Sequence, residues 1–253
     1  MKRFLTFLKT ELKLSLREMN MPIFAVIMPL VIFVILGIIY GAKLAYEGAN
    51  YTFLEQSFGA VGAVAICAGG LMDLPQAVAG SRERKVLKRL RVTPVSPVFI
   101  LCVEPAMYIV YCAVSLATLT VPALMWGIRL HGSLPRFLAS WLLTMLSTLS
   151  VGMLVGGVAK NTKQAGALAS VLYFPMLIFS GTTLPIEVMP RTMQRVVSLF
   201  PLTQGIAMMK NSFLGIRTGS ILLPVCVMLA LTALCNGCLS VSSVGNKKRG
   251  CLS

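Results

Sequence analysis

Six runs of mostly apolar residues divide this chain, and each is long enough to cross a lipid bilayer as a helix. A transmembrane helix needs about 20 such residues, because the hydrocarbon core of a bilayer is about 30 Å thick. We therefore expect an all-α polytopic membrane protein with six transmembrane helices. The third run is too long for one straight span, so its helix is expected to tilt or to begin at the interface. The expected spans lie at about residues 22–40, 58–78, 98–126, 137–158, 164–184 and 221–241.

The composition agrees with a membrane protein. The 253 residues are 57% hydrophobic and 12% charged, whereas soluble domains average about 25% charged residues. Such a chain is too apolar to be disordered. It also carries too few charges to cover the surface of a soluble enzyme, so lipid is its natural solvent.

The distribution of charge predicts an orientation. The chain has 23 lysines and arginines against 8 acidic residues, a formal net charge of +15. In a soluble protein this excess would indicate a nucleic-acid partner, but in a membrane protein basic residues collect in cytoplasmic loops. Sixteen of the 23 lie before span one, between spans two and three, between spans four and five, or after span six. We therefore expect no nucleic-acid partner, and a multi-pass protein of the inner (cytoplasmic) membrane with both termini, including the tail 242–253, in the cytoplasm.

Residues 1–21 are expected to contain an amphipathic helix on the cytoplasmic membrane surface. Leucines recur there at spacings of three and four, and basic residues recur at a spacing of four on another face. Such a helix can be a topological anchor in the lipid headgroups, or a lever that passes motion from a cytoplasmic partner. The two sets are Leu5, Leu8, Leu12 and Leu16, and Lys9, Lys13 and Arg17.

The loop between spans two and three combines dense basic charge with a small apolar stripe. Ser81 can cap a short helix there, and Pro94 and Pro97 can end it. The loop is either an ordinary positive cytoplasmic loop or a helix that docks into a groove on another protein. The residues singled out for docking are Arg82, Glu83, Arg84, Lys85, Leu87, Lys88, Leu90 and Arg91.

Residues 185–217 predict an outer hairpin of two short amphipathic helices. Pro190 and Pro201 each stand where a helix can begin. The apolar faces should be buried in lipid or against the spans, because exposing large apolar side chains is unfavourable. The hairpin either narrows an exit path or lies on the surface without a gating role. The two apolar faces are Met189, Met193, Val196 and Phe200, and Leu202, Ile206, Met209 and Phe213.

The order of these segments resembles the permease subunit of type-2 ABC transporters over nearly the whole length. The basic loop ends in Thr93-Pro94-Val95-Ser96, and a later segment runs from Phe179-Ser180-Gly181 through Pro185 and Glu187 to Met189-Pro190. That segment is followed by Leu199-Phe200-Pro201-Leu202-Thr203. The resemblance implies that residues 1–253 form one type-2 transmembrane domain with a re-entrant outer hairpin.

The same resemblance implies partners and roles. The permease would pair with an identical or related second permease chain, and each chain would bind a separate ABC ATPase subunit. Residues 82–91 would form the coupling helix, and Lys160 and Lys163 would lie in a second cytoplasmic contact. The chain has no Gly-Lys pair, which a phosphate-binding loop requires, so ATP and Mg²⁺ are expected on the partner and no cofactor on this chain. The outer gate would include Gly181, Pro185, Glu187, Pro190 and Pro201.

Two acidic residues fall inside expected spans, Asp73 in span two and Glu104 in span three. They can form a salt bridge or cap near the inner membrane surface, or they can couple transport to protons or ions. The second possibility defines a competing function, an ion-coupled secondary transporter or channel.

Nothing in the sequence indicates catalysis or metal binding. His131 is the only histidine, so no His-based triad or His cluster is possible. Together with the resemblance to type-2 ABC permeases, this implies a non-enzymatic subunit of an ATP-driven exporter, with membrane lipid around it. Its substrate would be amphipathic or apolar, such as a drug, a peptide antibiotic or a lipid, so multidrug efflux is one expected role. A scaffold that binds ATPase without transporting is a third possibility.

Overall fold

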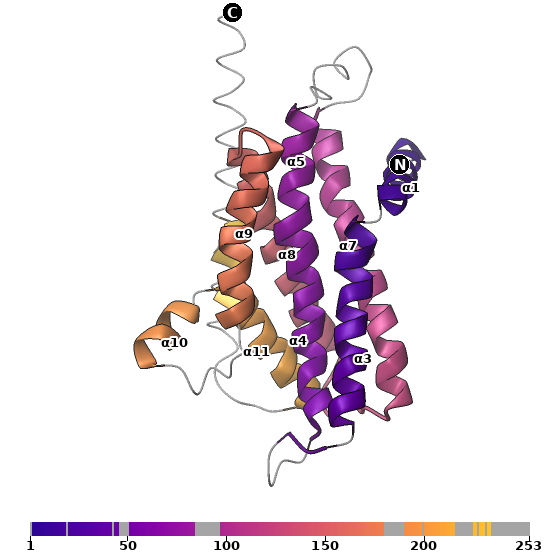
Figure 1. Ribbon diagram of the computed structural model, residues 1–253, viewed down its shortest axis with the longest axis vertical. Helices are drawn as coiled ribbons and strands as arrows, with labels where there is room; N and C mark the ends of the chain where they lie inside the picture. The colour runs from indigo at the N-terminus through magenta and orange to yellow at the C-terminus, as the bar shows by residue number, and fades with distance from the viewer. Residues whose placement is uncertain are drawn as a thin grey trace, which may run out of the picture.

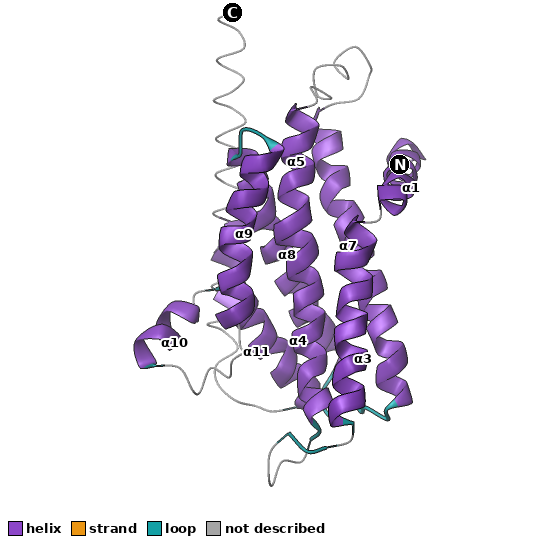
Figure 2. Ribbon diagram, viewed as in Figure 1, coloured by secondary structure: helices purple, strands orange, loops and turns teal. Residues whose placement is uncertain are grey.

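Helices account for nearly all of the regular structure that the computed structural model describes (Figures 1 and 2). The described residues are 2–18, 20–41, 43–45, 51–83, 97–179, 190–198 and 200–215, with short pieces at 225–226, 228–230 and 232–233. The helices are α1 (Lys2–Glu18), α2 (Asn20–Pro22), η1 (Ile23–Ile27), α3 (Met28–Tyr40), α4 (Phe53–Cys67), η2 (Ala68–Asp73), α5 (Leu74–Glu83), α7 (Pro97–Met125), α8 (Leu134–Val158), α9 (Thr162–Phe179), α10 (Arg191–Val197) and α11 (Pro201–Leu214). The elements η1 and η2 are π-helical.

The all-α membrane class predicted from the sequence is confirmed. Within the described residues, four helices are long and apolar enough to cross a membrane: Ile23–Tyr40, Phe53–Glu83, Val103–Met125 and Leu134–Val158. Helix α9 lies beside them where the fifth span was predicted. Most of the sixth predicted span and the whole tail 242–253 lie outside the described residues, so the count of six spans stays a prediction.

The longest candidate span is a central helix made of α4, η2 and α5, running from Phe53 to Glu83. It is longer than the 58–78 expected, because polar residues extend it at both ends. Thr52 and Glu55 form a reciprocal capping box at its start. At the other end, Ser81 lies inside the helix, so its predicted role as a cap was wrong.

Glycines let the central helix approach α8 closely. A Cβ at Gly152 would overlap the carbonyl oxygen of Gly70, and one at Gly156 would lie 2.9 Å from the carbonyl oxygen of Pro75. Gly152 and Gly156 form a G-x-x-x-G pattern, which permits close helix contact in membranes. The sequence analysis did not use this pattern. It fixes the position of α5 relative to α8.

Helix α11 is an internal part of the bundle, packed against α4 and α8. Its predicted apolar face is buried, with Leu202 and Met209 fully inaccessible. In helix α10, Met193 and Val196 are exposed and Val197 is the buried residue. Burial of the α10 apolar face in lipid, one of the two predicted arrangements, stays a prediction.

The N-terminal helix α1 is amphipathic as predicted, but it uses only part of its leucine face. Leu8 and Leu12 pack against the core, while Leu5 and Leu16 are half exposed. Tyr111 of α7 donates a hydrogen bond of 3.1 Å to Ser15 Oγ, which attaches α1 to the bundle. The basic residues of the other face are exposed.

The close contact between the central helix and α8 predicts a large difference between two glycine substitutions. Gly152→Ala forces the two backbones apart and is expected to destabilise the protein by about 1–3 kcal/mol, as overpacking does. Gly62→Ala is the matched control, because a Cβ there meets nothing within 4 Å. Thermal unfolding in detergent measures both variants. Equal melting temperatures would contradict the close contact.

Candidate functional site

The two ends of the bundle carry different polar groups. We call one the basic end, formed by Arg82, Glu83 and residues 156–164, which lies at the top of Figure 1. The other is the opposite end, formed by Thr52, Glu55, residues 126–133 and the end of α11.

At the basic end, Glu83 attaches α5 to the first turn of α9. Its Oε2 accepts hydrogen bonds from the backbone nitrogen of Thr162 at 2.9 Å and from the Thr162 hydroxyl at 2.6 Å. A carboxylate is favoured at a helix N-terminus, where free N–H groups and the positive end of the helix dipole meet. Glu83 therefore holds the end of the central helix against the start of α9.

Arg82 attaches the same end of α5 to the end of α8. Its Nη1 donates to the carbonyl oxygens of Gly156, at 3.5 Å, and Gly157. A cation is favoured at a helix C-terminus, where carbonyl groups lack partners. Arg82 thus binds the C-terminal end of α8, and the neighbouring Glu83 binds the N-terminal end of α9. We call Arg82, Glu83, Gly156, Gly157 and Thr162 the three-helix junction.

The short loop between α8 and α9 and the first turn of α9 each present one exposed lysine beside this junction. Gln164 Oε1 accepts from the backbone nitrogen of Lys160 at 3.0 Å, and Asn161 Oδ1 accepts from the backbone nitrogen of Gln164 at 2.8 Å. Lys160 and Lys163 are exposed. The structure therefore brings the start of the predicted coupling loop and the second predicted contact to one end of the bundle. The other coupling residues, Arg84, Lys85, Leu87, Lys88, Leu90 and Arg91, lie outside the described residues.

The two predicted intramembrane acids lie on adjacent helices. Glu104 Oε1 accepts a long hydrogen bond of 3.5 Å from Ser81 Oγ. Asp73 ends η2, and its buried Oδ2 has no hydrogen-bond partner among the described residues. Asp73 forms no salt bridge within the described part of the chain, so the structure gives it no basic partner there.

Of the predicted outer-gate residues, the structure describes two. Pro190 is the exposed residue before α10, and Pro201 is the buried first residue of α11. Gly181, Pro185 and Glu187 lie outside the described residues.

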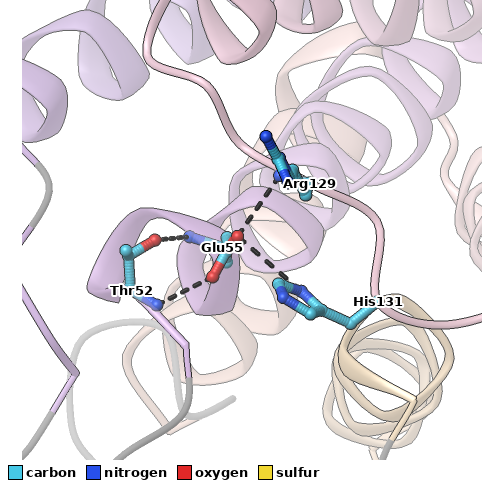
Figure 3. Close-up of polar contacts among 4 residues, drawn as sticks. All are labelled: Thr52, Glu55, Arg129 and His131. Atoms are coloured by element: carbon cyan, nitrogen blue, oxygen red, sulfur yellow. Dashed lines mark hydrogen bonds and ion pairs between the residues drawn. The ribbon is translucent and has the colours of Figure 1, made fainter.

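The most complete polar cluster is at the opposite end and was missed by the sequence analysis (Figure 3). Glu55 is 6% exposed, and its Oε2 accepts from the backbone nitrogen of Thr52 at 2.8 Å. Its Oε1 accepts from the backbone nitrogen of Arg129 at 3.2 Å and lies 3.7 Å from His131 Nδ1. The signal was present in the sequence, because Thr52-x-x-Glu55 is a capping-box pattern.

The Glu55 cluster also positions α11. The loop that holds Arg129 and His131 continues to Gly132, whose backbone nitrogen donates to the carbonyl oxygen of Phe213 at 2.9 Å. One buried carboxylate therefore connects the start of α4, the loop between α7 and α8, and the end of α11.

The helical membrane bundle with its charged three-helix junction is the architecture of a multi-pass membrane protein. The family model described as ABC-2 type transporter matches residues 2–214, and the chain belongs to that family. Among curated proteins, the chain is similar to the inner membrane transport permease YhhJ of Escherichia coli (strain K12) and of Shigella flexneri. Each is 28% identical over 129 residues, covering 50% of this chain and 34% of the relative. The matched region thus spans about a third of the length of those relatives.

Removing the Glu55 carboxylate is predicted to loosen the opposite end. Glu55→Ala leaves the backbone N–H groups of Thr52 and Arg129 without an acceptor, which should cost about 1–3 kcal/mol of stability. Glu55→Gln keeps one acceptor oxygen and should cost less. Thermal unfolding of the purified protein ranks the two variants, with exposed Thr10→Ala as a control. A Glu55→Ala variant as stable as the wild type would refute the assigned role.

Proposed function

We propose that this chain is the membrane-spanning permease subunit of an ATP-driven exporter. A separate ABC ATPase subunit would bind ATP and Mg²⁺, and a second permease chain would complete the transport path. Family membership over residues 2–214 and the candidate spans support this proposal. The exporter would lie in the inner membrane, with the basic end in the cytoplasm.

The three-helix junction is the observation that carries the proposal. Residues 84–91 continue directly from Glu83, and Glu83 and Arg82 are bonded to α9 and α8. A partner that grips this loop would therefore push three helices at once. Lys160 and Lys163 provide positive charge beside the loop for the same partner. Closure of the ATPase subunits could thus be passed to the spans through contacts within one end of the bundle.

The route through the membrane would end near α11. This helix is buried between α4 and α8 and is attached to the loop 126–133. A displacement of the central helix would therefore displace α11 as well. We propose that the segment from Gly181 to Pro201 forms the outer gate with α11. The substrate would be amphipathic or apolar, and the large apolar side chains exposed on the described spans support this proposal.

One observation favours a second candidate function, an ion-coupled transporter. The Asp73 Oδ2 is buried without a partner among the described residues, as a proton-carrying carboxylate can be. Affinity purification from native membranes separates the two candidates. A retained partner with a G-x-x-x-x-G-K-[ST] motif supports the exporter. Substrate movement by the chain alone, driven by a proton gradient without ATP, would refute it.

Charge reversal in the coupling loop gives a direct prediction. The triple change Arg84→Glu, Lys88→Glu and Arg91→Glu should reduce transport by the ATPase–permease complex at least about tenfold, because one tenfold step corresponds to only about 1.4 kcal/mol of binding. Membrane insertion should persist. Transport by proteoliposomes and the amount of co-purified ATPase measure the two effects.

A matched control reverses three exposed charges at the other side of the molecule, Arg136→Glu, Arg191→Glu and Arg195→Glu. This variant should bind ATPase as the wild type does. Unchanged transport after the coupling-loop reversal, or equal loss in both variants, would contradict the docking role.

A further inference from the structure

We infer that one face of helix α1 binds the headgroups of anionic phospholipids through Lys9, Lys13 and Arg17. The inference goes beyond the proposed function, because it holds whatever energy source drives transport. It combines three observations: the exposed charge on α1, the place of α1 where the chain enters the membrane, and the leucines that lie beside the basic residues.

The exposed face of α1 carries positive charge. Lys9, Lys13 and Arg17 are spaced four residues apart, so they lie along one side of the helix over about 12 Å, at a rise of about 1.5 Å per residue. All three are exposed, and no salt bridge engages them among the residues that the structure describes. Glu11 is partly buried and stands two residues from Lys9 and from Lys13, which places it on another side of the helix. The three cations are therefore available to an anionic partner.

The position of α1 brings this face to the membrane surface. Helix α2 begins two residues after α1 ends and leads directly into the candidate span Ile23–Tyr40. In Figure 1 the 17-residue α1 is strongly foreshortened, whereas α3 and α4 stand upright, so α1 crosses the direction of the spans. An amphipathic helix that crosses the spans where one of them begins lies at the level of the lipid headgroups.

Exposed leucines beside the basic residues favour lipid over a protein partner. Leu5 and Leu16 are 52% and 51% exposed, and they stand four residues before Lys9 and three residues after Lys13. At a membrane surface, acyl chains cover such leucines while long basic side chains extend to the phosphate groups. The sequence analysis allowed α1 to contact either headgroups or a cytoplasmic partner, and this mixed face favours the headgroups.

Contacts with the bundle hold α1 with its basic face outward. Leu8 and Leu12 pack against the core. Ser15 is buried; its Oγ accepts the hydrogen bond from the Tyr111 hydroxyl and donates to Met21 Sδ at 3.0 Å. The apolar side of α1 is therefore covered by the protein itself, and a lipid bound to the basic side is attached to α7 through α1.

Native mass spectrometry of the purified full-length chain tests this inference. Phosphatidylglycerol and phosphatidylcholine with the same acyl chains are titrated separately, so that the two lipids differ only in the headgroup. We expect the wild type to bind phosphatidylglycerol at least about tenfold more tightly. The triple change Lys9→Gln, Lys13→Gln and Arg17→Gln should abolish this preference, because the attraction of neighbouring basic residues to anionic headgroups adds up.

Two matched variants serve as controls. Arg136→Gln, Arg191→Gln and Arg195→Gln together remove the same charge from other exposed positions and should leave the preference intact. Lys9→Arg with Lys13→Arg keeps the charge and should bind phosphatidylglycerol within about threefold of the wild type, a difference of only about 0.7 kcal/mol. Binding by this second variant shows that the charge of α1, and not the shape of its lysines, holds the lipid.

The inference is wrong if the wild type binds both lipids equally, or if the α1 glutamine variant keeps the preference. Equal loss of preference in the glutamine variant of the other arginines would also contradict it, because binding would then follow total charge. Displacement of the lipid by millimolar inorganic phosphate would indicate a site for small anions instead. Loss of co-purified ATPase with unchanged phosphatidylglycerol binding would assign the basic face of α1 to the partner subunit.

Discussion

The structure depends on the close contact between the central helix and α8. Glycines at positions 70, 152 and 156 let the two backbones meet, and packing of this kind, rather than the hydrophobic effect, holds helices together in lipid. The contact sets the register between the helices. Two turns after Pro75, that register places Arg82 at the carbonyl groups that end α8 and Glu83 beside the start of α9. A bundle with this contact loosened would lose the three-helix junction as well.

At both ends of the bundle, charged side chains bind backbone groups that the helix ends leave without partners. Helix ends leave backbone groups without partners, and near a membrane these groups need partners from the protein. At the basic end, Arg82 and Glu83 supply them from a single helix terminus. At the opposite end, the Glu55 carboxylate accepts hydrogen bonds from the backbone nitrogen of Thr52, at the start of its own helix, and from that of Arg129. The spans between the two ends are packed largely through apolar and small residues.

The sequence predicted the fold class, whereas the predicted site residues stay predictions. Apolar runs predict membrane helices because lipid allows few alternatives, and the buried face of α11 followed from its periodicity. The Arg129 partner of Glu55 and the Thr162 partner of Glu83 could not be predicted, because these hydrogen bonds join residues 74 and 79 positions apart. The sequence analysis assigned Glu83 to a partner surface, whereas the structure gives it a bond within the chain. Met193 of α10 follows a helical period but is exposed on the described bundle, where the prediction also allowed burial in lipid.

The central claim is that the basic end moves as one body when the ATPase closes. A thiol cross-link between Glu83→Cys and Thr162→Cys tests it most directly, in a variant of the complex whose native cysteines are replaced. If the junction stays closed throughout the cycle, a short cross-linker should leave ATP-driven transport within about twofold of the reduced protein, a difference of only about 0.4 kcal/mol. Loss of transport on cross-linking, restored by reduction, would show that α5 and α9 must separate, and would contradict the account.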